Sequence, residues 1–260
     1  MPDKKSVVIR PAKGFTGSMS LPGDKSISHR YAMLGAIADG LTKLENFSTG
    51  ADCASTLECL KTLGVKWERI GDVVAIYGHG PKLKAPNAPL DCGNSGSTIR
   101  MLSGILAGQK FTSELTGDDS LRRRPMARII KPLEMMGAKT TATDGGRPPL
   151  RITGGRLKAI DYKLPVASAQ VKTSLLFAGL YADGTTRVAE PIQTRDHGEH
   201  ALEAFGAQLE RRMKEVSIAG GQKLNAIEAT IPGDFSSAAF FLCAAGLFPD
   251  SQLTISGLLL

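Results

Sequence analysis

Three polar residues near the beginning of the sequence have side chains suited to holding an anion. Lys25 offers an ammonium group, Ser26 a hydroxyl and Arg30 a guanidinium. The residues around them predict the start of a helix, where unpaired backbone N–H groups and the helix dipole attract phosphate or carboxylate. Ser26 and Arg30 are four residues apart and therefore share one helix face. Taken alone, such a trio more often marks a helix cap, here Asp24 or Ser26, than a ligand site.

Two later segments repeat this arrangement. Residues 93–98 contain hydroxyl groups and Gly96, whose missing side chain would let a ligand approach the backbone closely. Ser168 and Gln170 supply a hydroxyl and an amide at a third predicted helix start. Each segment by itself is more often a plain helix cap. Because the pattern recurs at three helix starts, we predict a shared anion-binding surface.

A run of three arginines, Arg122, Arg123 and Arg124, stands directly before Pro125. Proline suits the first position of a helix, so we expect the arginines in the connection that leads into it. A run of charge is usually a solvated surface. At a helix start, however, a guanidinium is well suited to bind phosphate through two parallel hydrogen bonds.

Residues 193–200 combine basic, acidic and hydroxyl side chains. His197 and His200 are three residues apart, as in some metal sites, but the sequence offers no third ligand and Arg195 would repel a cation. We therefore predict no metal site. We expect Thr194 or Asp196 to cap a helix and Arg195 to be available to an anion.

The charge balance also favours anionic partners. Lysine and arginine number 32 against 25 aspartates and glutamates, a formal net charge of +7. Aromatic residues make up only 5% and do not alternate with basic ones as on surfaces that stack nucleic-acid bases. Phosphorylated metabolites are therefore favoured over nucleic acid. The sequence patterns of a Ser-His-Asp triad and of a P-loop are absent.

The cysteines and the apolar segments indicate where the protein resides. No two cysteines show the spacing of a zinc or redox motif, and we expect all four to be reduced and buried: Cys53, Cys59, Cys92 and Cys243. The first ten residues lack a long apolar stretch, and the nearly apolar run 235–248 is too short to span a bilayer. We predict a cytoplasmic protein without membrane contact.

The chain contains an internal repeat. Gly64, Gly137 and Gly206 each follow an apolar helical stretch and are 73 and 69 residues apart, and glycine is the residue favoured just beyond a helix end. Strand-like stretches follow, such as 73–77 and 150–153. We predict a mixed α/β fold of three units of about 70 residues, each a βαβαββ-type module that packs against the others.

Two features of the repeat are irregular. Pro132 lies inside the predicted second helix of the middle unit and should kink it. The helix is still favoured because five apolar residues fall on one face: Met126, Ile129, Ile130, Leu133 and Met136. A fourth helix start follows Gly233, but the sequence ends before that unit is complete.

Several blocks of the sequence resemble, in order, the conserved blocks of the 5-enolpyruvylshikimate-3-phosphate (EPSP) synthase family. These blocks are residues 21–30, 91–100, 121–126, 166–172, 194–197 and 231–241. The resemblance implies the enolpyruvyl transferase fold of two similar domains, each with three units. It implies transfer of the enolpyruvyl group of phosphoenolpyruvate to the 5-hydroxyl of shikimate 3-phosphate, in aromatic amino-acid biosynthesis. No metal or organic cofactor is implied.

The resemblance also assigns roles to single residues. Lys25 matches a catalytic residue that contacts both substrates, and Gly96 and Arg124 fall where the family meets phosphoenolpyruvate, the site at which glyphosate competes. The remaining matches concern shikimate 3-phosphate: Ser26, Arg30, Ser168, Gln170, Thr194 and Arg195. Ala169 stands where many members carry serine, so one hydroxyl contact would be missing.

The family's domain division predicts where this chain folds into separate parts. Residues 21–233 should form a complete three-unit domain, and residues 1–20 and 234–260 parts of an incomplete one. The family's catalytic aspartate and glutamate would lie in a C-terminal half beyond residue 260. We therefore expect a partial sequence that is inactive alone and a monomer when complete.

Two alternatives stay open at this point. UDP-N-acetylglucosamine enolpyruvyl transferases share the fold and the chemistry, but residues 24–30 differ from their opening block. A non-catalytic anion- or RNA-binding repeat protein would explain the charge and the repeat, but not the blocks. Steep, sequence-independent binding to polynucleotide would distinguish the latter.

Overall fold

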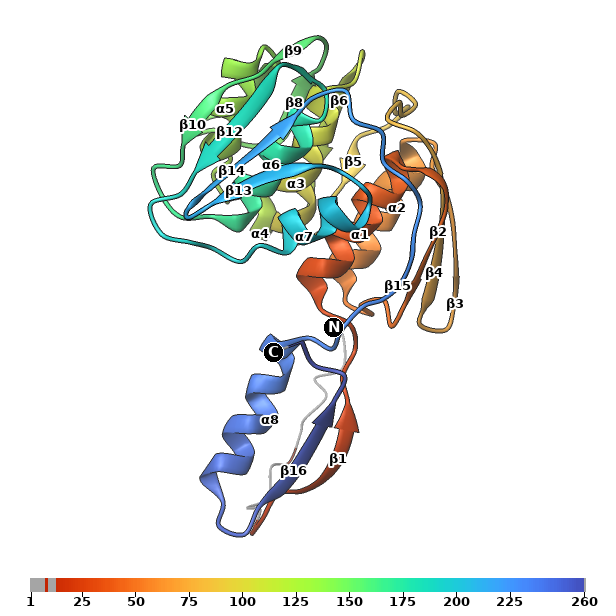
Figure 1. The fold of residues 1–260 in the computed structure, drawn as a ribbon, viewed down its shortest axis with the longest axis vertical. Coiled ribbons are helices and arrows are strands. Elements are labelled where there is room, and N and C mark those ends of the chain that lie inside the picture. The colour runs from red at the N-terminus through yellow and green to blue at the C-terminus, as the bar shows by residue number, and fades with distance from the viewer. Residues whose placement is uncertain (1–7, 9–12, 260) are drawn as a thin grey trace.

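The computed structural model describes residue 8 and residues 13–259. A body of three α/β units holds most of these residues (Figure 1). A smaller lobe extends from one end of the body and contains β1 (Thr16–Ser20), α8 (Phe235–Leu247) and β16 (Gln252–Ser256). The predicted mixed α/β fold of repeated units is confirmed.

Each unit contains one four-stranded sheet, and the three sheets share one topology. Their strand orders are β15-β2-β4-β3, β5-β6-β8-β7 and β10-β12-β14-β13. In each sheet the first two strands pair in parallel and the other neighbours pair antiparallel. Strand β15 comes from the far end of the chain and completes the first sheet, so the third unit is tied back to the first.

The strands of the first sheet are β2 (Asp39–Glu45), β3 (Lys66–Ile70), β4 (Val73–His79) and β15 (Glu228–Thr230). Those of the second are β5 (Leu90–Asp91), β6 (Thr112–Thr116), β7 (Lys139–Thr143) and β8 (Arg147–Thr153). Those of the third are β10 (Asp161–Lys163), β12 (Thr185–Ala189), β13 (Leu209–Arg212) and β14 (Glu215–Ala219). A short parallel pair, β9 (Leu157–Lys158) with β11 (Ala182–Asp183), links the second and third units.

The first helix of each unit lies at the centre of the body. These helices are α1 (Lys25–Ile37), α3 (Gly96–Ala107) and α6 (Ala169–Gly179), and 10 of 13, 10 of 12 and 9 of 11 of their residues are buried. The second helices bury one side only: α2 (Ala51–Thr62), α5 (Ala127–Met136) and α7 (His197–Ala204). A helix buried on all sides is a core helix, so the sheets and outer helices enclose the three central ones.

The second helices end as the sequence predicts. Gly64, Gly137 and Gly206 follow the three helix ends with φ of +84°, +110° and +91°, a region that favours glycine. Helix α5 continues through Pro132, with Ile129 and Leu133 buried on its inner face.

The prediction that Pro125 opens α5 was wrong. The helix starts two residues later, at Ala127. Met126 occupies the cap position because its side chain is fully buried and its N–H donates to the Gly146 carbonyl at 2.7 Å. Arg122 belongs to the short helix α4 (Asp119–Arg122), and Arg122 and Arg123 are exposed.

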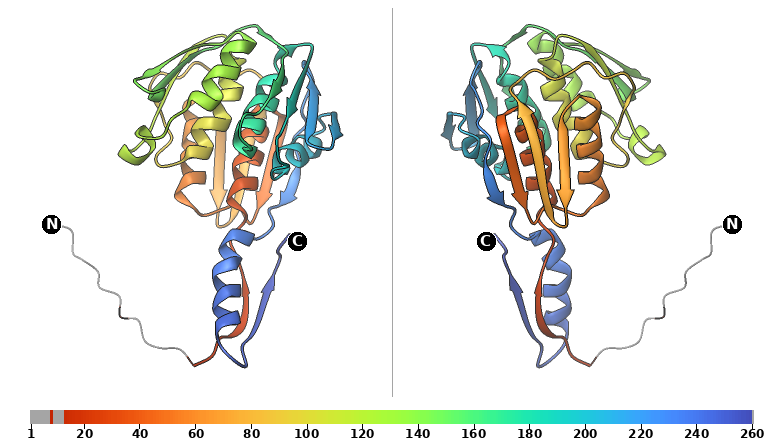
Figure 2. Two further views of the ribbon diagram at one scale, coloured as in Figure 1. Left: turned by 90° about the vertical axis from the view of Figure 1, so that its left-hand side faces the viewer. Right: turned by 90° about the vertical axis from the view of Figure 1, so that its right-hand side faces the viewer.

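Two connections with the same Pro-Gly-Asp sequence join the body and the lobe, residues 22–24 and 232–234. The aspartate N–H of each donates to the proline carbonyl of the other, at 2.7 and 3.0 Å. Asn46 Nδ2 donates to the carbonyl of Ile231 at 2.9 Å. Asp24 caps α1 and Asp234 caps α8. The two connections therefore leave the body as one hydrogen-bonded pair (Figure 2).

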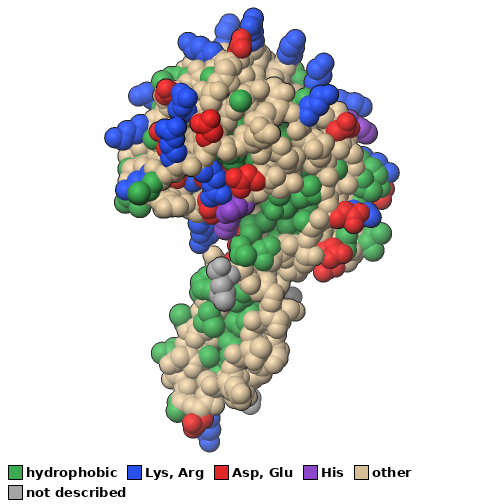
Figure 3. All heavy atoms as spheres, viewed as in Figure 1, with side chains coloured by type: hydrophobic (Ala, Val, Ile, Leu, Met, Phe, Trp, Pro, Cys, Tyr) green, Lys and Arg blue, Asp and Glu red, His purple; other side chains and the backbone are tan. Residues whose placement is uncertain are grey.

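Helix α8 is apolar, yet little of it is covered. Ala238 is its one buried residue, whereas Phe240 and Leu247 are 80% and 79% exposed. Figure 3 shows hydrophobic side chains on this lobe. In the part of the chain that the structure describes, no helix combines the length and apolar character needed to cross a bilayer.

The path of the chain supports a division into domains, which we propose as predicted. Residues 21–233 would form one domain, and residues 1–20 with 234–260 would belong to another. Residues 1–7, 9–12 and 260 of the second group lie outside the described residues.

The contact between α3 and α6 leads to a first prediction. A Cβ added at Gly104 would overlap the backbone carbonyl of Ser174, so Gly104→Ala should lower the free energy of unfolding by about 3 kcal/mol. Denaturant unfolding followed by circular dichroism measures this change. The control is Gly246→Ala in α8, where no atom lies within 4 Å of the added Cβ. Equal effects of the two substitutions would contradict the close packing of α3 on α6.

Candidate functional site

A cavity of 590 Å³ lies between the body and the lobe, at the N-terminal ends of several helices. Lys25 and Ser26 of α1, Gln170 of α6 and Arg195 all line it. Ser97 of α3 and residues 236–237 of α8 complete this part of the wall. The structure thus brings four of the predicted site residues to one cavity, and its volume suits a small ligand.

Lys25 forms an ion pair at this cavity. Its Nζ lies 3.1 Å from Asp52 Oδ2, and the two side chains are 49% and 26% exposed. Asp52 stands in the first turn of α2, where a negative charge is favourable. A half-exposed ion pair contributes little stability, so the ammonium group is available to an incoming anion.

Arg30 lies behind the cavity wall rather than in it. The residue is 2% exposed, and its guanidinium donates to Thr173 Oγ1 at 3.1 Å and to the Ser26 carbonyl at 2.9 Å. Burial lowers the pKa of Arg30 to about 10, against the opposing charges of Glu199 and Asp24. The group stays protonated near neutral pH, so a buried positive charge lies between α1 and α6.

A second group of cations surrounds the start of α3. Arg100 donates to Gln170 Oε1 at 3.0 Å and to the Gly96 carbonyl at 3.3 Å, and Arg124 donates to Asn94 Oδ1 at 2.8 Å. A Cβ added at Gly96 would lie 2.5 Å from Arg100 Nη1 and 3.2 Å from Arg124 Nη1. Gly96 is therefore the point where two guanidinium groups approach the backbone.

Arg100 is a candidate site residue that the sequence analysis missed. Burial and the neighbouring charges of Arg124 and Arg128 lower its pKa, so positive charge is concentrated here. The acceptors of Arg100 and Arg124 are neutral, which leaves their charge available to an anion. Its position four residues after Gly96, the spacing that separates Ser26 from Arg30, could have signalled this role.

Besides Arg30, Gly96 and Arg124, two further predicted residues do not line the cavity. Ser168 caps α6, and its Oγ accepts from the N–H of Val171 at 3.4 Å. Thr194 donates through Oγ1 to Glu190 Oε2. Both hold the backbone segments from which Gln170 and Arg195 reach the cavity.

The sequence and fold can be compared with those of known proteins. Residues 9–260 match the profile of the family described as EPSP synthase (3-phosphoshikimate 1-carboxyvinyltransferase). The chain belongs to the EPSP synthase family.

Curated relatives of this family carry the name 3-phosphoshikimate 1-carboxyvinyltransferase. One from Koribacter versatilis is 59% identical over 98% of this chain, and one from Solibacter usitatus is 54% identical over 96%. A solved EPSP synthase from Acinetobacter baumannii matches with a TM-score of 0.89 and 46% identity, over 95% of this chain and 57% of that chain. The chain spans 60% and 59% of the length of the two curated relatives.

The segment before α7 in this EPSP synthase family member differs from expectation. Asp196 occupies the cap position, but its side chain makes no capping hydrogen bond. Its Oδ2 instead lies 3.1 Å from His200 Nε2 and pairs with Arg211, while Thr194 turns to Glu190. The prediction of a side-chain cap was therefore wrong, because charged partners outcompete the helix N–H groups.

Within residues 8 and 13–259, no cluster of three or more potential ligands is placed to hold a metal.

The cysteines follow the prediction with one exception. Cys53, Cys59 and Cys92 are buried and free. Cys243 is exposed because it lies on α8, where little of the helix is covered.

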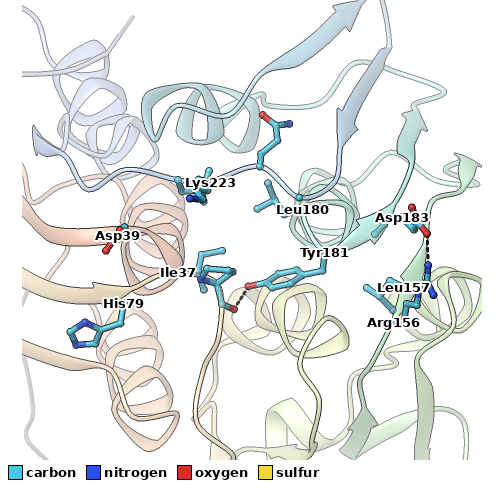
Figure 4. Close-up of a pocket in the computed structure, with 15 residues that line it drawn as sticks. Ile37, Asp39, His79, Arg156, Leu157, Leu180, Tyr181, Asp183 and Lys223 are labelled. Atoms are coloured by element: carbon cyan, nitrogen blue, oxygen red, sulfur yellow. Dashed lines mark hydrogen bonds and ion pairs between the residues drawn. The ribbon is translucent and has the colours of Figure 1, made fainter.

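A larger cavity of 740 Å³ lies at the other ends of the central helices (Figure 4). Ile37 ends α1 there, Leu180 caps the end of α6, and the Tyr181 hydroxyl donates to the Pro81 carbonyl at 2.9 Å. Helix C-terminal ends carry the negative end of the dipole, which disfavours an anion. The larger cavity is therefore the poorer candidate for phosphate.

A buried series of hydrogen bonds links the helices that carry the candidate site. His29 Nδ1 lies 2.7 Å from Thr56 Oγ1, which lies 2.7 Å from Thr98 Oγ1, and Thr98 donates to Ser95 Oγ at 2.7 Å. Thr98 uses its one proton on Ser95, so Thr56 donates to Thr98 and His29 Nδ1 donates to Thr56. This direction places a proton on Nδ1, and the series of hydrogen bonds ties α1 to α2 and α3. Burial lowers the pKa of His29, so the ring is neutral near pH 7.

The buried hydrogen bonds of His29 predict that the folded protein loses stability in acid. Burial lowers the pKa of His29 to about 3, against 6.5 for a free histidine, so the folded state binds fewer protons than the unfolded state below pH 6.5. Stability should be fully present above pH 6.5 and fall towards pH 3. The difference in unfolding free energy between the protein and His29→Asn, which keeps a donor but does not titrate, should change by roughly 1.4 kcal/mol per pH unit in this window. A constant difference from pH 7 to pH 4 would contradict a buried neutral His29.

Proposed function

We propose that this chain binds shikimate 3-phosphate and phosphoenolpyruvate for the transfer of the enolpyruvyl group to the shikimate 5-hydroxyl, with release of phosphate. The observation that carries the proposal is the cavity at the N-terminal ends of the central helices, with Lys25 and Arg195 in its wall. Helix N-termini and cations are suited to phosphate. The names of the curated relatives support the same reaction, a step of the shikimate pathway.

The two substrates would use different parts of the site. Shikimate 3-phosphate would lie against Ser26 and Gln170, with its phosphate near Arg195. Phosphoenolpyruvate would lie towards the start of α3, where the acceptors that the described residues offer to Arg100 and Arg124 are neutral. Lys25 lines the cavity and would contact both substrates. Three residues would act from behind the cavity wall. Ser168 and Thr194 would hold the segments that carry Gln170 and Arg195, and Arg30 would add a buried positive charge.

The reaction also needs proton transfer. One proton must reach the phosphoenolpyruvate methylene carbon and one must leave the 5-hydroxyl. Of the carboxylates in and beside the cavity, Asp24 and Asp234 cap helices, and Asp52 stands in the first turn of α2 as the counter-ion of Lys25. We propose that this chain provides binding and charge stabilisation, and that the proton-transfer groups belong to the part of its relatives' length that it does not span. It would then show no turnover alone.

Other properties of the family remain predictions for this chain. They are reaction without a metal or organic cofactor, a cytoplasmic location and a monomeric complete protein. Of the two alternatives, the UDP-N-acetylglucosamine enolpyruvyl transferase is less favoured by the relatives' names. The RNA-binding alternative would need basic and aromatic side chains along one groove, whereas the cavity wall holds Phe240 as its one aromatic residue among mainly polar side chains.

Calorimetric titration of the chain with shikimate 3-phosphate tests the proposal. We expect binding at millimolar ligand and a clear preference over unphosphorylated shikimate. Lys25→Met should weaken binding by about 1.5 to 3 kcal/mol, because it removes a charge-assisted contact, and Ser26→Ala by about 1 kcal/mol.

The matched control is Lys61→Met, since Lys61 is exposed at the far end of α2 and should leave the affinity unchanged. Equal binding of shikimate and its 3-phosphate, or stronger binding to polynucleotide, would overturn the proposal.

Gly96→Ala provides a separate test of the phosphoenolpyruvate part. The added methyl group would push the guanidinium groups of Arg100 and Arg124 apart, so we expect phosphoenolpyruvate affinity to fall several-fold. Shikimate 3-phosphate affinity should change less than about twofold, since Gly96 does not line that cavity. Titration of each ligand measures the two effects, and equal losses for both would contradict separate binding regions.

A further inference from the structure

Three ionisable side chains that the proposed reaction does not use are buried together beneath the cavity wall. Lys172 of α6 is 2% exposed at its side chain, and its Nζ lies 2.6 Å from Glu190 Oε1 and 2.6 Å from Glu199 Oε1. The two carboxylates are 4% and 5% exposed. The ammonium group of Lys172 therefore forms an ion pair with each of the two buried carboxylates.

The two glutamates stand at the two ends of one loop. Glu190 directly follows β12, and Glu199 lies in the first turn of α7. The second oxygen of Glu190 accepts from Thr194 in the middle of the loop. Lys172 thus fixes both ends of residues 190–199, and Glu190 also fixes their centre. We name this contact set the Lys172 clamp.

The clamped loop carries a cation to the cavity. Arg195 follows Thr194, is exposed and lines the cavity wall. The other end of the clamp influences Arg30, since the charge of Glu199 favours the protonated guanidinium. Gly198 lies close above Arg30, because a Cβ added there would be 3.5 Å from Arg30 Nε. Arg30 and Arg195, two of the cations near the proposed phosphate position, are therefore adjacent to the clamp.

The contribution of buried ion pairs to folding stability does not by itself explain why this cluster is present. Replacing buried ion pairs by apolar side chains of similar volume is often neutral or stabilising, because desolvation offsets the attraction. A short ammonium contact to two carboxylates does restrict where each can lie. The charged groups beside the cluster, Arg211 and Glu215 of the β13–β14 hairpin among them, face a gap of only 30 Å³. Little empty space is therefore left between the cluster and these neighbouring side chains.

We propose that Lys172 is a positioning residue, which holds residues 190–199 so that Arg195 presents its guanidinium to the phosphate of the bound ligand. The part of this proposal that concerns the ligand rests on the proposed function. The part that concerns the loop does not, so the two can be tested separately.

Two variants and one control test the loop. Lys172→Met leaves two unpaired buried carboxylates and is expected to destabilise the chain. The triple variant Lys172→Met, Glu190→Gln, Glu199→Gln removes every charge of the clamp and keeps the side-chain sizes. Two amides at the ends of the loop are hydrogen-bonded, since the N–H of residue 190 donates to the Lys214 carbonyl at 2.8 Å and the N–H of His200 to the Asp196 carbonyl at 3.0 Å. Hydrogen exchange of these two amides in the free chain should become at least tenfold faster in the triple variant. The exposed-lysine control Lys61→Met should leave it unchanged, and unchanged exchange in a folded triple variant would overturn the clamp.

A double-mutant cycle tests the effect on the ligand. In calorimetric titrations with shikimate 3-phosphate, the triple variant should bind about tenfold more weakly than the unmodified chain. In an Arg195→Ala background the same three substitutions should change the affinity less than about twofold, because the residue they position is absent. A tenfold loss in both backgrounds would mean that the clamp does not act through Arg195. If the unmodified chain does not bind the ligand, the proposed function fails and hydrogen exchange alone decides on the loop.

Discussion

The candidate site depends on three buried helices that point in one direction. Helices α1, α3 and α6 are covered by apolar contacts over most of their residues, so none could be stable outside the three-unit body. Because the units share one topology, the N-terminal ends of these helices meet on one side of the body and their C-terminal ends on the other. Their dipoles add instead of cancelling. Apolar burial thus creates an end of the body that attracts anions.

Positive side chains reinforce this end in two ways. Arg30 is satisfied by protein acceptors and stays fixed below the surface. Arg100 and Arg124 have neutral acceptors and lie close to each other around Gly96. Like charges held together are costly unless an anion lies between them, so the free protein is arranged to gain energy when a phosphate or carboxylate binds.

The lobe takes part in the same site through its connections to the body. The paired Pro-Gly-Asp segments leave the body together, and the aspartate of each starts a helix, α1 in the body and α8 in the lobe. Residues 236–237 of α8 then form part of the cavity wall. The position of this wall depends on close backbone contact at Gly23, where a side chain would overlap the Asn46 carbonyl. The two short connections therefore hold α8 where its first turn forms part of the cavity wall.

The sequence by itself determined the local features of this protein. Apolar periodicity and the glycines at 64, 137 and 206 predicted the units, and the polar residues at helix starts predicted that Lys25, Ser26, Gln170 and Arg195 could hold an anion. Only the tertiary structure decided that Arg30 is buried, that Arg100 joins the site and that Lys172 pairs with Glu190 and Glu199. It also decided which of two cavities suits an anion. The physical reason is that periodicity reflects neighbours three or four residues apart, whereas the burial and pairing of a charge depend on contacts between units far apart in the sequence.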